Sequence, residues 1–135
     1  MRTSRQDFDR LFASAGAARE NACASYSKFK VGAAVLTNDG RIYTGCNVES
    51  SSYGLTMCAE RNALAGALCA GERDFKAILI TADTPGPVSP CGACRQLIFD
   101  YAPDIEVIMT NIKGSSAAED ISVLLKYPFG LSKLK

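Results

Sequence analysis

A small group of cysteine and glutamate residues carries the strongest chemical signal in this sequence. Cys91 and Cys94 form a C-x-x-C pair in the segment PCGAC, and Cys58 stands earlier in the tripeptide CAE. The chain contains no histidine, so any zinc must be held by thiolates or carboxylates. Three cysteine ligands leave the fourth position of a tetrahedral Zn²⁺ open for water, as catalytic zinc requires. A structural zinc site is the alternative, although it would need a fourth ligand.

Residues close to these cysteines fit catalysis at the metal. Glu60 lies two residues after Cys58, where its carboxylate can act on a water as general base and general acid. We expect Arg61 to hydrogen bond to the thiolates and to offset their excess negative charge. Cys58 and Cys91 both stand where a helix is expected to begin, and helix N-termini stabilise thiolates. The other cysteines are expected to be small buried hydrophobic residues; they are Cys23, Cys46 and Cys69.

Hydrophobic spacing and turn residues predict alternating helices and strands along the chain. Helices are expected over Arg5–Cys23, Cys58–Ala70, Pro90–Tyr101 and Asp120–Leu125. Strands are expected over Lys30–Thr37, Arg41–Val48, Ala77–Ala82 and Ile105–Thr110. The turn Asn38-Asp39-Gly40 joins the first two strands into an antiparallel hairpin. The later strands are linked through helices and are expected to run parallel.

This alternation predicts an α/β fold in which helices cover both faces of a sheet. We expect a three-layer α-β-α sandwich with a mixed sheet of about five strands. A chain of 135 residues has the size of one ordinary domain. A single domain is therefore expected over residues 1–135.

Composition and charge narrow the classes of function. Hydrophobic residues make up 47% of the chain and charged residues 21%, which is typical of globular proteins. A net charge of +1, with no basic run, argues against a nucleic-acid partner. The longest apolar run, Ala63–Ala70, is too short to span a membrane, and the N-terminus lacks the apolar region of a signal peptide. We therefore expect a cytoplasmic protein with no membrane partner.

Several segments carry dense motifs: Tyr26–Ala34 (YSKFKVGAA), Gly45–Glu49 (GCNVE), Tyr53-Gly54, Cys58–Ala63 (CAERNA) and Asp83–Gln96 (DTPGPVSPCGACRQ). Together they resemble the cytidine deaminase family, specifically its small homotetrameric zinc-dependent type with three cysteine ligands. The zinc deaminases share an H-x-E…P-C-x-x-C signature with a Cys₃ variant, and here Cys58 stands in the place of the histidine. Ser25 departs from the usual family proline, and the ending Tyr127–Leu131 differs from the commoner tail.

The resemblance implies roles for residues outside the metal site. It places Phe29 against a pyrimidine ring and assigns Asn47 and Glu49 to ribose hydroxyls. The spacing of Asn47 and Glu49 agrees, because residues i and i+2 of a strand project from one face. The resemblance also implies that the Ala59 amide and the Ser89 carbonyl bind the edge of the base.

Self-association is a further implication of the resemblance. Small deaminases of this type form homotetramers in which aromatic residues complete the active site of a neighbouring subunit. Here Tyr53 and Phe129 are the aromatic residues expected to cross over. The alternative for Phe129 is packing in the core of its own subunit.

The residues and the resemblance together predict one activity, with Zn²⁺ as cofactor and a small nucleoside as substrate. This activity is hydrolytic deamination of cytidine or 2′-deoxycytidine to uridine or 2′-deoxyuridine and ammonia, a step of pyrimidine salvage. A nucleoside-antibiotic deaminase of the blasticidin-S type is the alternative, although Asn47 and Glu49 favour a ribose. The near-neutral charge disfavours a nucleic-acid-editing protein, and Glu60 disfavours a non-catalytic zinc module.

Overall fold

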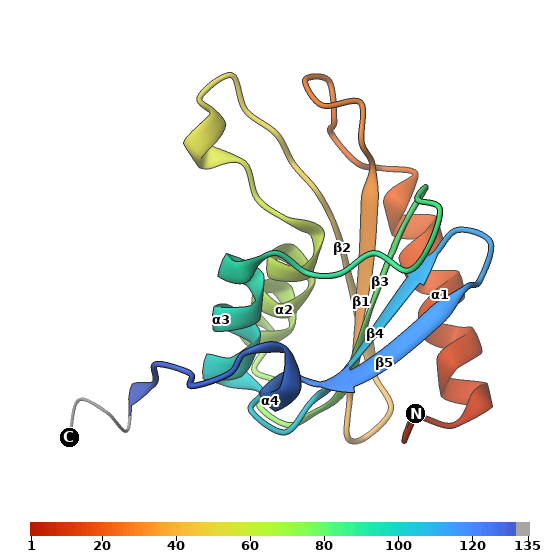
Figure 1. The fold of residues 1–135 in the computed structure, drawn as a ribbon, viewed down its shortest axis with the longest axis vertical. Coiled ribbons are helices and arrows are strands. Elements are labelled where there is room, and N and C mark those ends of the chain that lie inside the picture. Colours follow the sequence, from red (N-terminus) through yellow and green to blue (C-terminus); the bar gives the residue numbers. More distant parts are fainter. Residues whose placement is uncertain (132–135) are drawn as a thin grey trace.

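A five-stranded mixed sheet forms the centre of the computed structural model, which describes residues 1–131 (Figure 1). Its strands are β1 (Val31–Thr37), β2 (Ile42–Cys46), β3 (Phe75–Ala82), β4 (Glu106–Asn111) and β5 (Ser116–Asp120). They lie in the order β2-β1-β3-β4-β5. β3 and β4 run parallel, whereas the other neighbouring pairs are antiparallel. The predicted hairpin and the predicted parallel pairing of β3 with β4 are confirmed.

Helices cover both faces of the sheet. α1 (Arg5–Arg19) lies on one face, and α2 (Ala59–Cys69) and α3 (Gly92–Tyr101) lie on the other (Figure 1). A short 3₁₀ helix, η1 (Tyr53–Leu55), precedes α2, and α4 (Ile121–Leu124) follows β5. The predicted three-layer α-β-α sandwich is therefore confirmed. No helix within residues 1–131 is both long and apolar enough to cross a bilayer.

Two hydrophobic clusters hold these layers together. Leu11 of α1 packs with Leu79 of β3 on one face of the sheet. Leu64 of α2 and Ile98 of α3 pack with Ile80 of β3 on the other face. Leu79 and Ile80 are consecutive, and successive side chains of a strand point to opposite faces. β3 is thus buried on both sides, as its continuous apolar sequence predicts.

Two glycines allow the helices to approach the sheet closely. A Cβ atom on Gly32 of β1 would overlap the carbonyl oxygen of Ala15 in α1. A Cβ atom on Gly45 of β2 would overlap the backbone amide of Ala63 in α2. Only glycine permits backbones to come this close. Gly45 therefore sets the distance between β2 and the helix that follows Cys58.

The end of α1 differs from the sequence-based prediction. The helix ends at Arg19 rather than at Cys23. The Cys23 amide instead donates to the Asn47 carbonyl at 2.9 Å, and the Cys23 carbonyl accepts from the Glu49 amide at 2.9 Å. Cys23 is thereby bridged to Val48, beyond the end of β2. These long-range hydrogen bonds replace the local ones that would have extended the helix.

β5 forms in a segment for which the sequence predicts no strand. Its residues, SAAED, include no β-branched or aromatic side chain, so β-propensity gives no signal there. Antiparallel pairing with β4 at the edge of the sheet supplies the hydrogen bonds instead. α4 then starts directly after β5, with Asp120 as its N-cap.

The cysteines outside the motif are less buried than expected. Cys23 and Cys69 are exposed, and Cys46 is partly buried. The expectation of burial is therefore wrong for Cys23 and Cys69. Cys69 is the last residue of α2 and Cys23 lies outside the named strands, so neither position is covered by the hydrophobic core.

Candidate metal and substrate site

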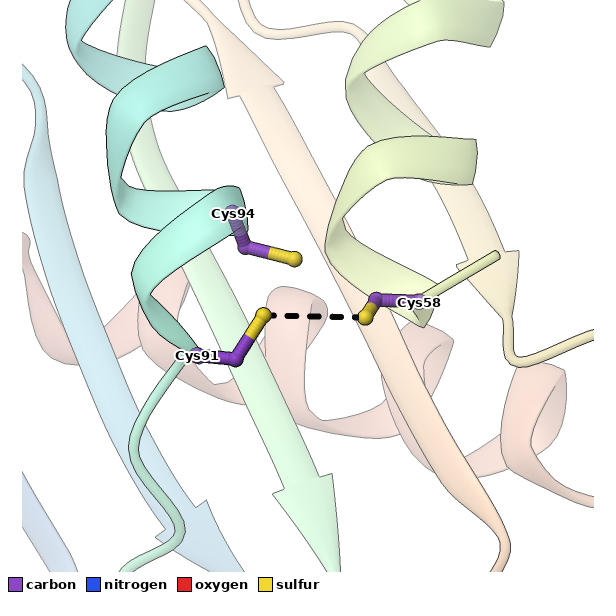
Figure 2. Close-up of side chains that lie close together, drawn as sticks. All are labelled: Cys58, Cys91 and Cys94. Carbon is purple, nitrogen blue, oxygen red and sulfur yellow. Dashed lines mark hydrogen bonds between the residues drawn. The ribbon is translucent and has the colours of Figure 1, made fainter. Parts of the chain in front are cut away.

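Three cysteine side chains converge between the N-termini of α2 and α3 (Figure 2). The Sγ atoms of Cys58, Cys91 and Cys94 all lie within 4.8 Å of one another. Cys58 is the N-cap residue of α2 and Cys91 is that of α3, whereas Cys94 lies in the first turn of α3 and is fully buried. Neither N-cap side chain hydrogen bonds to its own helix. Both sulfur atoms are therefore available as ligands.

The geometry and protonation of this cluster fit zinc. Tetrahedral Zn²⁺ with Zn–S bonds of about 2.3 Å separates its sulfur ligands by roughly 3.8 Å. The Cys58 and Cys91 Sγ atoms are 3.8 Å apart. Hydrogen bonds from the Cys94 and Cys91 thiols lower the pKa of Cys58 to about 6, with help from the charge of Arg61. The pKa of Cys94 is raised, because Cys94 hydrogen bonds to Cys58 and is buried. The separation of the Cys58 and Cys91 sulfur atoms therefore matches that of two ligands of one zinc ion.

Glu60 lies in the first turn of α2, next to the sulfur cluster. Its side chain is buried, with only 5% of the residue exposed. Burial raises the pKa of Glu60 above its ordinary value, and the charge of Cys58 raises it further. A carboxylate whose pKa is raised is a stronger base than an ordinary carboxylate, which suits a general base.

Arg61 occupies the position next to Glu60 and contacts the loop before α2. Its Nη2 donates to the carbonyl oxygen of Thr56 at 2.7 Å. Its buried Nε has no hydrogen-bond partner among residues 1–131. The guanidinium lowers the pKa of the Cys58 thiol through its charge and a hydrogen bond. Arg61 therefore favours the thiolate form that a metal ligand requires.

A cavity of about 290 Å³ opens beside the cluster. Its lining includes the predicted site residues Phe29, Asn47, Glu49, Cys58, Ala59, Glu60, Ser89 and Cys91. These residues come from the N-terminal end of α2, from the segments before β1 and after β2, and from the loop that leads into α3. The fold thus brings a metal-binding face, a buried acid and an aromatic side chain to one cavity.

Family comparison agrees with this arrangement. Residues 5–110 match the family model described as the cytidine and deoxycytidylate deaminase zinc-binding region, and this range contains all three cysteines of the cluster. The chain belongs to this deaminase family. The cytidine deaminase of Sporosarcina psychrophila is 48% identical over 129 residues, which cover 95% of each chain. The crystal structure of the cytidine deaminase from Burkholderia pseudomallei superposes with a TM-score of 0.88 at 48% identity, covering 94% of this chain and 100% of that one.

The deaminase also has a more distant antibiotic-acting relative. The blasticidin-S deaminase of Bacillus cereus is 37% identical over 91 residues, which cover 62% of this chain and 65% of that protein. The identity is lower and the overlap shorter than for the cytidine deaminases above. Zinc as the cofactor of this deaminase, predicted from the cysteine spacing, is confirmed by the family match and by the cluster.

Asn47 and Glu49 line the cavity of the deaminase, but both side chains also bind the protein's own backbone. Asn47 donates through Nδ2 to the Phe29 carbonyl at 2.8 Å and accepts from the Val31 amide at 2.9 Å. Glu49 accepts from the Ser27 amide at 3.0 Å and from the Ser27 hydroxyl. The pair therefore orders the segment that carries Phe29.

Tyr53 and Phe129 do not line the cavity of their own chain. Tyr53 is 76% exposed and lies in a neighbouring hollow that shares Ser27, Glu49 and Thr56 with the cavity. Phe129 is 61% exposed and lies near α3, where its carbonyl accepts from Gln96 Nε2 at 2.7 Å. Phe129 is therefore not part of the hydrophobic core of the single chain.

Other residues of the cavity have no role in the sequence analysis; they are Ser27, Val31, Thr56, Ile80 and Val88. Ser27 lies in the motif segment Tyr26–Ala34, two residues before Phe29, so the sequence could have indicated that it lies near the cavity. Thr56 and Val88 have no distinctive chemistry, and only the folding of their loops brings them to the cavity.

Proposed function

We propose that this protein is a cytidine deaminase, a hydrolase that converts cytidine and 2′-deoxycytidine to uridine and 2′-deoxyuridine with release of ammonia. The observation that supports the proposal most strongly is the buried Glu60 carboxyl in the same cavity as the Cys58 and Cys91 thiols. Zn²⁺ held by Cys58, Cys91 and Cys94 would act as a Lewis acid and make a water molecule a better nucleophile.

Glu60 is the group that moves protons in this reaction. It accepts a proton from the attacking water as the oxygen bonds to C4 of the pyrimidine, and it passes that proton to N3. It then takes the remaining proton of the new C4 hydroxyl and delivers it to the amino nitrogen as the C4–N bond breaks. Ammonia leaves, and a carbonyl group remains at C4. The raised pKa of Glu60 suits a group that must alternate between the two protonation states.

The remaining cavity residues hold the nucleoside. Phe29 offers an aromatic ring to the pyrimidine, while the Ala59 amide and the Ser89 carbonyl bind the edge of the base. Glu49 keeps lone pairs beyond those used by the backbone, and it accepts hydrogen bonds from the ribose hydroxyls. Asn47 keeps one Nδ2 hydrogen for the sugar, because its other contacts use one hydrogen and the oxygen.

A homotetramer is the assembly that we propose. Several large apolar side chains are exposed in the single chain, including Tyr53 at 76%, Phe129 at 61% and Leu131 at 69%. Contact with neighbouring copies would cover them and close the cavity against water, which favours catalysis at a metal. Reciprocal contacts of this kind produce closed symmetry. Tyr53 and Phe129 then reach the cavities of neighbouring subunits.

The cytoplasm is the compartment that we propose, because a site of three reduced thiols is maintained there. Deamination of free cytosine nucleosides returns them to the uridine pool. The protein would therefore act in pyrimidine salvage.

A blasticidin-S type deaminase is the second candidate, supported by the relative that is 37% identical. Absorbance assays on cytidine, 2′-deoxycytidine, blasticidin S and a cytosine-containing single-stranded oligonucleotide separate the candidates, with zinc measured on the same sample. We expect turnover of both nucleosides, and a kcat/KM for blasticidin S that is lower by about 100-fold or more. Preferential turnover of blasticidin S would favour the second candidate. Preferential turnover of the oligonucleotide would contradict both.

A further inference from the structure

We propose that Ser27 is a positioning residue that couples Glu49, which binds the sugar, to Phe29, which contacts the base. The inference rests on the proposed function, because it takes Glu49 and Phe29 to be nucleoside contacts. Ser27 itself touches neither the reacting atoms nor the metal. It acts by fixing where the two binding residues lie relative to each other.

The hydroxyl of Ser27 joins the two residues directly. It donates to Oε2 of Glu49, and it accepts from the backbone amide of Phe29 at 3.0 Å. The backbone amides of Tyr26 and Ser27 both donate to Oε1 of Glu49 at 3.0 Å. Both carboxylate oxygens are therefore bound to the segment that leads into Phe29. The single proton of the Ser27 hydroxyl is committed to Glu49, so it cannot also serve the substrate.

The backbone between Ser27 and Phe29 takes an unusual conformation. Lys28 has a φ of 61°, in the left-handed region that a residue other than glycine seldom adopts. Its amide donates to the Ala24 carbonyl at 2.9 Å. This tight turn allows the Phe29 amide to reach back to the Ser27 hydroxyl. Hydrogen bonds must hold such a conformation in place, and the Ser27 hydroxyl provides one of them.

The other side of Phe29 is held by the same strand region. The Phe29 carbonyl accepts from Asn47 Nδ2 at 2.8 Å, and Asn47 stands two residues before Glu49. The backbone of Phe29 is thus bound at its amide through Ser27 and at its carbonyl by Asn47. Removing the Ser27 hydroxyl would break the contact to the Phe29 amide and leave the contact between Asn47 and the Phe29 carbonyl intact.

The same contacts keep Glu49 ready to accept hydrogen bonds. The hydroxyl and the amide of Ser27 lower the pKa of Glu49 below its ordinary value. Glu49 is therefore ionised at neutral pH, and a carboxylate accepts but does not donate. Without the Ser27 hydroxyl, Oε2 loses its protein partner and the carboxylate is held only through Oε1, by the amides of Tyr26 and Ser27. Recognition of sugar hydroxyls then suffers more than contact with the base.

Ser27 contributes to the site rather than to the core. The residue is exposed and lines the cavity together with Phe29 and Glu49. Replacing it with alanine removes no apolar contact from either hydrophobic cluster. We therefore expect a Ser27→Ala variant to fold and to bind zinc.

The test compares cytidine with 2′,3′-dideoxycytidine, which lacks the 2′- and 3′-hydroxyls of the sugar. We expect Ser27→Ala to lower kcat/KM for cytidine by about ten-fold, mainly through KM. The loss on the dideoxynucleoside should be markedly smaller, so the preference for cytidine falls. Ser27→Thr keeps the hydroxyl and should stay close to wild type. Ser115→Ala is the matched control, because Ser115 is exposed in the turn before β5 and far along the chain from the site.

Binding provides a second measurement that does not depend on turnover. Calorimetric affinities for both nucleosides are measured in a Glu60→Gln background, with and without Ser27→Ala. A fall in the cytidine to dideoxycytidine affinity ratio would support the coupling. Equal losses for both nucleosides, or no loss, would overturn the role of Ser27 and leave the proposed function standing. Failure of the wild-type protein to deaminate cytidine would instead contradict the proposed function.

Discussion

The Sγ atoms of Cys58 and Cys91 lie 3.8 Å apart, although the two residues belong to different helices. Each is the N-cap residue of its helix, Cys58 for α2 and Cys91 for α3. Two helix N-termini therefore point their unpaired amides and positive dipole ends toward the same sulfur atoms. This arrangement stabilises negative charge before any metal binds, and it explains why the cluster forms at this place in the fold.

Loss of one ligand should remove the metal. We expect Cys94→Ala to lower the zinc content from about one ion per chain to a small fraction of that value, because two thiolates bind zinc far more weakly than three. Elemental analysis of purified protein measures this content. Cys69→Ala is the matched control, because Cys69 is exposed at the end of α2. Full zinc content in Cys94→Ala would show that Cys94 is not a ligand.

Asn47 and Glu49 should respond differently to substitution. Asn47→Ala loses hydrogen bonds to the backbone of Phe29 and Val31, so we expect about 1–3 kcal/mol lower unfolding free energy as well as weaker nucleoside binding. Glu49→Gln should weaken binding with a smaller effect on stability. Thermal unfolding and KM for cytidine, measured on both variants, test this. Unchanged kcat/KM for cytidine in both would contradict the ribose assignment.

Stability in acid should depend on Glu106, which ties the N-terminus to the sheet. Its carboxylate accepts from the Thr3 hydroxyl at 2.6 Å and from the amides of Arg2 and Thr3 at 2.7 and 2.9 Å. Burial acts to raise the pKa of Glu106, but these hydrogen bonds hold it below its ordinary value. Such a group stabilises the fold above its unfolded pKa of about 4.3, and this stabilisation is lost as pH falls through the folded pKa.

The corresponding variant is Glu106→Gln. We expect it to be less stable than wild type at pH 7 by about 1–3 kcal/mol, with the difference shrinking as pH falls below about 4.3. Urea unfolding at a series of pH values measures the difference, and Glu119→Gln on exposed β5 is the control. A difference that does not change with pH would argue against an ionised Glu106 as the source.

Phe129 should contribute to activity but not to the stability of the hydrophobic core. It is 61% exposed in the single chain, so Phe129→Ala should leave thermal stability of the monomer fold nearly unchanged while lowering kcat/KM. Light scattering at micromolar concentration should give the mass of a tetramer for the wild type. A fully active monomer would contradict the proposed assembly.

Mixing of subunits tests whether Phe129 acts on a neighbouring site. Phe129→Ala and Glu60→Gln chains are unfolded and reassembled together in varied ratios. If Phe129 acts across the interface, the activity of mixed tetramers should deviate from the sum of independent subunits. Activity that follows the fraction of Phe129→Ala chains alone would place its action within one subunit.

The sequence predicted the layers of the fold and the metal cluster because those features depend on local signals. Cys58, Cys91 and Glu60 stand at helix starts, and helix starts can be read from spacing and capping. β5 gave no such signal, because its residues pair at a sheet edge where β4 supplies the hydrogen bonds. The end of α1 and the contacts of Asn47 likewise depend on partners distant in the chain, such as the pairing of Cys23 with Asn47. Residue types alone do not reveal these pairings.

The most direct test of the account is cytidine turnover by the wild type and by Glu60→Gln, with zinc measured on both samples. We expect the zinc-loaded wild type to produce uridine and ammonia in equal amounts. Glu60→Gln should keep its zinc and lose about 10²–10⁴-fold in kcat, because a positioned general acid and base has been removed. Wild-type turnover by zinc-loaded Glu60→Gln, or no uridine from the zinc-loaded wild type, would contradict the account.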